Sequence, residues 1–312
     1  MIRYLKNEEI VKKKWDRCID HSVNGRIYAY SWYLGTVFPE WSAFVMDDYQ
    51  AVFPIVSQQK MGVKYAFQPV FTQQLGIFTP LLLTSELVND FLSKLYEQFS
   101  FVEMNLNAHN KISPKNHKVT YKVNHELDLI GDHLTIKKEY STNTKRNIKK
   151  AQKASLSIFK NLKPEALIQL FKDNKGSKIN SLTESDYQIL IRLLYKLIDR
   201  GRCEVWACFD QKNELCAAAS FIRDQRRFVF LFSATNEDAR DNGAMFYLID
   251  SFIESHSQTK MILDFEGSND PNLARFYKSF GSSVVKYPHL FYNGLSWYFS
   301  LAWKMKRRFK YQ

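Results

Sequence analysis

The sequence is poor in cysteine, with four in 312 residues, which is too few for a disulfide scaffold. Three of them, Cys203, Cys208 and Cys216, lie in apolar runs that are typical of strands, and their spacing matches no zinc pattern. We therefore expect reduced, buried thiols and no bound metal.

Long apolar runs are also missing. The longest, such as Leu215–Ile222, have the length of a strand, whereas a membrane-spanning helix needs 18 or more residues. Charged residues, including Arg3, Lys6 and Glu8, occupy the place where a signal peptide has its apolar stretch. We expect a cytoplasmic protein without a membrane span, one that can still contact the inner face of the membrane.

Aromatic residues are abundant at 15%, and 45% of the chain is hydrophobic, which indicates a globular protein long enough for two domains. Helical periodicity predicts helices at 86–99, 164–172, 184–200, 243–256 and 271–280. Runs of residues that favour β-structure predict strands at 41–46, 51–56, 64–71, 101–106, 118–123, 203–209, 215–222, 227–233, 261–266 and 283–288. The order strand, strand, strand, helix, strand occurs twice, about 160 residues apart. This pattern predicts an α/β protein with mixed sheets, built from two domains of one fold at 1–136 and 156–312.

The net charge of +12 lies almost wholly in two segments. Residues 137–153 contribute +6 and residues 304–310 contribute +5, so the remainder is close to neutral. Lys145, Lys149 and Lys153 recur every four residues, which predicts a basic helix over 137–155, between the domains. Either this helix is a solvated face or it binds an anionic partner, namely tRNA, a nucleotide-linked precursor or an acidic lipid surface; we expect no DNA binding.

A helix opens at Asn242, Gly243 and Ala244, shortly after the strand that ends at Ser233. The unpaired amides of a helix start attract anions, and Arg240 adds a cationic side chain. Any strand, turn and helix can produce this arrangement by chance.

The pattern Arg240-x-x-Gly243-x-Met245 resembles the phosphate-binding turn of the GNAT acyl-CoA N-acyltransferase superfamily, although Met245 replaces a small residue. The segments 140–151, 263–268 and 273–281 resemble the Fem-type branch, whose aminoacyltransferases extend peptidoglycan precursors with a tandem GNAT fold. The resemblance implies that Ser233, Arg240, Asn242, Gly243 and Ala244 bind a coenzyme A thioester such as acetyl-CoA.

The resemblance also implies that an amine attacks the donor carbonyl directly, in a gap between the strands 228–233 and 261–266. Backbone N–H groups there can stabilise the oxyanion, and Asp264 or Glu266 can take the amine proton. Strand alternation leaves open which of the two faces the cleft. Lys278 offers positive charge to a phosphate or to the tetrahedral intermediate.

In the first half, Tyr30 and Trp32 belong to an aromatic cluster, which forms either core packing or a wall of the acceptor site. Lys145 and Arg146 of the basic helix are the cationic candidates for substrate binding. Three functions remain open: an N-acyltransferase that uses a thioester donor, a Fem-type transferase that uses aminoacyl-tRNA to modify a cell-wall precursor, and a catalytically silent GNAT-like binding protein.

Overall fold

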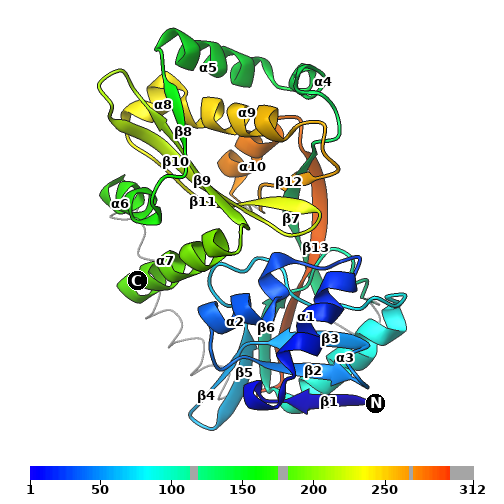
Figure 1. Ribbon diagram of the computed structural model, residues 1–312. Coiled ribbons are helices and arrows are strands. Elements are labelled where there is room, and N and C mark those ends of the chain that lie inside the picture. The colour runs from blue at the N-terminus through cyan, green and yellow to red at the C-terminus, as the bar shows by residue number, and fades with distance from the viewer. Residues whose placement is uncertain (113–118, 175–181, 267–269, 296–312) are drawn as a thin grey trace. The chain divides into compact units, whose positions relative to one another are not determined.

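The computed structural model describes residues 1–112, 119–174, 182–266 and 270–295 (Figure 1). The chain forms two compact units, unit 1 (Met1–Lys122 with Lys286–Gln312) and unit 2 (Val123–Val285). This division differs from the boundaries expected from sequence, because residues 123–136 belong to unit 2 and the chain from Lys286 on belongs to unit 1. The single basic helix expected over 137–155 is instead two helices, at His133–Lys138 and Thr142–Lys153, both in unit 2. The second basic segment, 304–310, lies outside the described residues.

Unit 1 contains two small sheets. Strands β1 (Ile2–Leu5), β2 (Ser42–Met46) and β3 (Ala51–Ile55) form an antiparallel sheet, and β4 (Ser57–Lys60), β5 (Val63–Phe67), β6 (Phe101–Asn105) and β13 (Ser283–Asn293) follow one another in the second. In the second sheet β5 and β6 run parallel, whereas the pairs β4–β5 and β6–β13 are antiparallel. The helices are α1 (Lys12–His21), α2 (Ser31–Val37) and α3 (Ser85–Gln98). Large rings fill the core, with Trp15 against Trp41 at 4.8 Å and Phe53 of β3 against Phe91 of α3 at 6.3 Å.

The sheet of unit 2 has the strand order β7 (Val119–Asp128), β12 (Ile262–Asp264), β11 (Arg227–Thr235), β10 (Leu215–Arg223), β9 (Cys203–Phe209) and β8 (Ser157–Lys160). Strands β9, β10 and β11 occupy the positions predicted for three successive strands, and they form an antiparallel meander. Strand β12 then pairs in parallel with β11, because the helical connection brings the chain back in the same direction. Unit 2 therefore has a mixed sheet, and the α/β class expected from the sequence is confirmed.

Helices cover both faces of this sheet. Helix α6 (Pro164–Asn174) packs on the face that carries Val205, Ala207 and Ala218, with α7 (Glu184–Asp199) beside it. The opposite face carries α9 (Ala244–His256) and α10 (Pro271–Lys278). The remaining helices are α4 (His133–Lys138), α5 (Thr142–Lys153) and the short α8 (Asp238–Asn242). Within the described ranges, no helix is both long and apolar enough to span a membrane.

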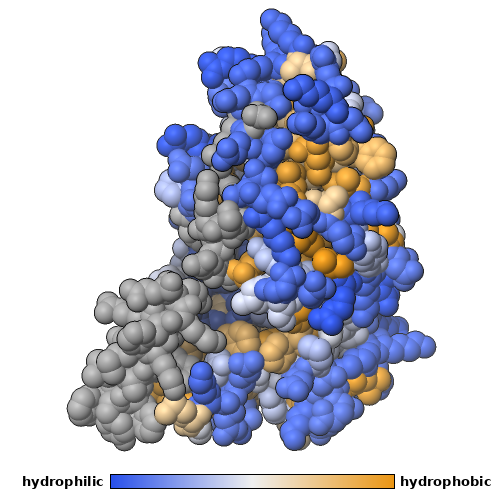
Figure 2. Space-filling view, turned by 90° about the vertical axis from the view of Figure 1, so that its left-hand side faces the viewer, coloured by the Kyte–Doolittle hydropathy of each residue, from blue (hydrophilic) through white to orange (hydrophobic). Residues whose placement is uncertain are grey.

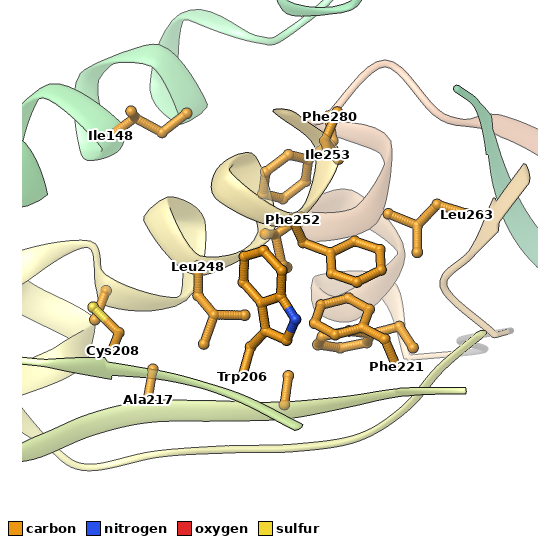
Figure 3. Packing of buried hydrophobic residues seen from close by; sticks show 14 of the residues in the cluster. Ile148, Trp206, Cys208, Ala217, Phe221, Leu248, Phe252, Ile253, Leu263 and Phe280 are labelled. Atoms are coloured by element: carbon orange, nitrogen blue, oxygen red, sulfur yellow. The ribbon is translucent and has the colours of Figure 1, made fainter. Parts of the chain in front are cut away.

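The core of unit 2 is layered from the sheet through α9 to α5 (Figure 3). Phe221 of β10 stacks on Phe252 of α9 at 3.6 Å, and Trp206 of β9 meets the same ring edge-on at 5.2 Å. Ile148 of α5 contributes from the far side of α9 (Figure 3). Helix α5 has an apolar underside of Thr144, Ile148 and Ala151, which explains why a lysine-rich helix folds onto the unit.

Gly243, at the start of α9, has a φ of 79° and lies against the backbone of α5. A Cβ at this position would be 2.4 Å from the carbonyl oxygen of Asn147. We expect Gly243→Ala to destabilise unit 2 by about 1–3 kcal/mol, since it adds a collision to a strained backbone. Gly201 is the matched control, because its φ is 63° but nothing lies within 4 Å of its Cβ position. Urea unfolding measures the free energy of unfolding of both variants. If Gly243→Ala lowered it no more than Gly201→Ala does, α5 would be able to move away from α9.

Candidate functional site

The parallel pairing of β11 with β12 is short and ends inside the unit. It covers three residue pairs, the last of which joins Val229 to Asp264. Strand β11 continues to Thr235, and in the described part of the chain no strand pairs with this edge of it beyond Val229. The pairing therefore stops where β12 itself ends, and in the described part of the chain the edge of β11 beyond Val229 has no strand partner.

A β-bulge lies directly after the point where the β11–β12 pairing ends. On β10, Phe221 faces Phe230 and Ser220 faces Phe232, so Leu231 is an extra residue on β11. A bulge of this kind bends the strand and turns backbone groups out of the ladder. It also reverses the side-chain alternation, so that Phe230 packs in the core beneath α9, whereas the ring of Phe232 lies tilted against that of Phe171 of α6, with their centres 4.7 Å apart.

Three charged side chains meet on the α6 face beside this gap. The Nη1 of Arg227 on β11 lies 2.7 Å from a carboxylate oxygen of Glu126 on β7 and 4.0 Å from one of Asp264 on β12. Their side chains are only 11%, 12% and 3% exposed, respectively. Strand register explains the meeting, because Asp264 is paired with Glu126 on one side and with Val229, two residues from Arg227, on the other.

Asp264 and Glu266, the two candidate proton acceptors, have different surroundings. Asp264 is buried, and its Oδ1 accepts a hydrogen bond of 2.8 Å from the backbone N–H of Glu266. Glu266 lies beyond the end of β12, is half-buried, and has a φ of 55°, which breaks the strand alternation that would place both carboxylates on one face. Burial and the negative charge of Glu266 raise the pKa of Tyr277 on α10, so this carboxylate lies near that helix.

Sequence reasoning missed Glu126, Arg227 and His125. The imidazole of His125 on β7 is buried, and burial and the positive charge of Lys278 lower its pKa. Its Nδ1 has no hydrogen-bond partner among the described residues. Val123, Leu127 and Leu129 alternate with polar residues, and His125 falls in the phase of the apolar ones. This was an available signal, but the expected strand ended at residue 123.

The predicted phosphate-binding turn is closely packed in the structure. The backbone N–H of Ala244 donates to Oδ1 of Asn242 at 3.0 Å, and Asn147 of α5 closes over Gly243. Arg240 is in α8, but its side chain lies outside the described part of the chain. Ser233 pairs with Ala219 in the β10–β11 ladder, beyond the bulge.

The other predicted site residues are distributed over both units. Lys278 is exposed at the end of α10. In unit 1, Tyr30 donates to Asp20 at 2.5 Å and lies 5.7 Å from the ring of Trp32. In unit 2, Lys145 donates to the carbonyl of Lys138, and Arg146 donates to Oδ1 of Asn143 at 3.0 Å. Among the residues that the structure describes, no group of three or more His, Cys, Asp or Glu side chains could hold a metal ion.

No sequence-family model matches the chain, and no curated protein matches it in sequence. Solved structures do match. FemX superposes with a TM-score of 0.62 at 12% identity, over 92% of this chain and 96% of FemX. L-PGS from Bacillus licheniformis gives 0.57 at 9% identity, over 93% and 94% of the two chains. The C-terminal domain of a putative lysylphosphatidylglycerol synthetase from Agrobacterium fabrum gives 0.56 at 10% identity, over 90% and 92%. The chain therefore has a GNAT-like, Fem-like tandem fold.

Proposed function

We propose that unit 2 is an N-acyltransferase domain that moves an acyl group from a thioester to an amine. The amine nitrogen attacks the carbonyl carbon, the carbon–sulfur bond breaks, and an amide and a free thiol are formed. The amine loses one proton and the thiolate gains one, so the protein needs only to position the reactants, stabilise the oxyanion and accept a proton.

The observation that carries this proposal is the edge of β11 beyond Val229, which has no strand partner in the described part of the chain because β12 ends there, next to the bulge at Leu231. An acyl carbonyl placed in the gap would meet the backbone edge of β11, where N–H groups can stabilise the negative oxygen. Such donors are fixed by the sheet, so they need no rearrangement when charge develops. This arrangement favours direct transfer without a nucleophilic side chain.

Glu266 is the proton acceptor that we favour, and Asp264 is its positioning residue. Glu266 follows the last strand residue and is half-buried, whereas Asp264 is buried and holds the backbone of Glu266. Arg227 fixes this end of β12 through its proximity to Asp264 and its ion pair with Glu126. Lys278, on the neighbouring helix, is the candidate cation for the donor.

Release of free thiol tests the proposal. The full chain is incubated with acetyl-CoA and a panel of amines, and thiol is measured against a reaction without amine. We expect amine-dependent thiol release that requires Glu266. If acetyl-CoA binds but neither acetyl-CoA nor aminoacyl-tRNA reacts with any amine, the proposal fails. The hypothesis of a catalytically silent binding protein is then supported.

A Fem-type transfer from aminoacyl-tRNA is the second candidate, and the outer face of α5 favours it. Arg146, Lys149, Lys150 and Lys153 are exposed there, opposite the apolar underside. The end of unit 2 that carries α5 in Figure 1 is mostly hydrophilic at the top of Figure 2. A basic helix face of this kind suits a phosphate backbone.

The triple substitution of Lys149, Lys150 and Lys153 by Glu tests this candidate. Because all three side chains are exposed, we expect the thermal midpoint to change little. Affinity for tRNA should fall at least about tenfold, and the salt dependence of binding should become shallower, since fewer counterions are released. Equal tRNA binding by both proteins across a salt series would identify this surface as a solvated helix face.

A further inference from the structure

Unit 2 contains a cavity of about 720 Å³ between α10 and the first turns of α5 and α9. Helix α10 provides most of the wall, α5 provides two polar side chains and α9 provides one ring. The lining residues are Ser141, Asn143, Phe246, Asn272, Arg275, Phe276, Lys278 and Ser279. The volume is that of a small-molecule site.

Two cations, Arg275 and Lys278, border the cavity one turn apart on α10. Across the described ranges, neither forms an ion pair with a carboxylate. On the opposite wall, the Oδ1 of Asn143 accepts a hydrogen bond from Arg146. Both cations lie in the last turn of α10, where the helix dipole stabilises positive charge. The dipole explains why cations occur at this position, but it does not explain why a cavity lies between them and α5.

The polar wall is fixed by the fold. The backbone N–H of Ser141 donates to the carbonyl of Ser279 at 2.9 Å, and the hydroxyl of Thr144 donates to the hydroxyl of Ser279 at 2.7 Å. These bonds attach the start of α5 to the end of α10. The cavity therefore does not depend on a closing movement within unit 2.

The apolar wall is aromatic. The rings of Phe246 and Phe276 meet edge-on, with their centres 4.9 Å apart, and both side chains are half-buried. Exposed ring surface beside cations suits a ligand that has a planar ring next to an anionic group.

The alternative anion site at the start of α9 is poorly suited to a phosphate. The carbonyl oxygen of Asn147 points a negative dipole at Gly243, and the Ala244 amide already has an acceptor. The cavity begins at Phe246, in the same first turn of α9, on the side that α10 faces.

We propose that this cavity binds a nucleotide, with phosphate between Arg275 and Lys278 and the planar base against Phe246 and Phe276. The inference deepens the proposed function, on which it rests, because it identifies the part of the donor that the protein holds. A nucleotide of this kind can come from coenzyme A or from the 3′ end of an RNA.

Calorimetric titration of the full chain with adenosine 3′,5′-bisphosphate tests the inference without any turnover. Adenosine and inorganic phosphate are titrated separately, and we expect each to bind more weakly than the bisphosphate. Arg275→Gln and Lys278→Gln should each weaken bisphosphate binding about 10–100-fold, since each removes a charge-assisted contact. Arg275→Lys should retain part of the affinity. Arg192→Gln is the control, because Arg192 is exposed on α7, on the opposite face of the sheet.

Coenzyme A and a short RNA ending in CCA distinguish the two sources, and preferential binding of either supports the site. Wild-type affinity in both Arg275→Gln and Lys278→Gln would overturn the inference, as would a wild-type protein that binds none of the nucleotides. Nucleotide binding that depends on Arg275, in a protein that transfers no acyl group, would leave the site standing and reject the proposed function.

Discussion

Glu266→Gln is expected to lower the rate of acyl transfer about 10²–10⁴-fold, with little change in affinity for the donor. The amide has nearly the shape of the carboxylate but cannot accept the amine proton. Asp264→Asn should also slow the reaction, because its Oδ1 holds the backbone of Glu266 at the end of β12. Single-turnover rates and donor titrations separate the chemical step from binding.

Glu214→Gln serves as the control, since Glu214 is exposed in the turn between β9 and β10. Raising the pH should restore part of the rate of Glu266→Gln, because a larger fraction of the amine is then already deprotonated. Full activity in both Glu266→Gln and Asp264→Asn would mean that solvent takes the proton, and the assignment of the site would fail.

Arg227→Leu should destabilise the protein by about 3–5 kcal/mol, the largest effect on stability that we expect near the site. The substitution leaves Glu126 and Asp264 on one buried face without the cation between them. Lys212→Leu, in the exposed turn before β10, should change the free energy of unfolding by less than about 0.5 kcal/mol. Urea unfolding at neutral pH measures both.

A second substitution shows whether charge is the cause. Adding Glu126→Gln to Arg227→Leu removes one of the two stranded carboxylates, so the double variant should recover part of the lost stability. If the two substitutions were simply additive, the cost would come from lost packing of the arginine and the electrostatic explanation would be wrong.

Local signals were sufficient to predict many of the elements. Thr183 accepts from Asp186 N–H in a capping box and starts α7, and Pro271 opens α10 after the capping Asp270. The helix predicted at 86–99 is observed at Ser85–Gln98, because its apolar residues recur at helical spacing. Such features depend on residues a few positions apart, which a single sequence displays.

Features that depend on distant partners were not predictable in this way. Strand β7 extends to Asp128 because its last residues, Glu126 to Asp128, pair with β12, which lies far along the chain. Leu231 forms a bulge because of its register with β10, which no property of a leucine indicates. Gly243 attracted notice as a helix start, but its contact with Asn147 becomes visible only once α5 lies on α9.

The resemblance and the structure contribute different parts of the candidate site. Asp264, Glu266 and Lys278 were named from sequence as chemistry-bearing residues, and the structure adds that the first is buried, the second follows the strand end and the third borders a cavity. Arg275 attracted no notice, because a lysine or arginine in the last turn of a helix is common.

The central claim is that the acyl carbonyl binds in the gap between β11 and β12. A crystal structure of the full chain with an unreactive ketone analogue of its donor tests this most directly. The account predicts that the ketone oxygen lies about 3 Å from a backbone N–H of β11 beyond Val229, with Glu266 facing the carbonyl carbon. A ketone bound outside this gap, with the donor fully ordered, would contradict it.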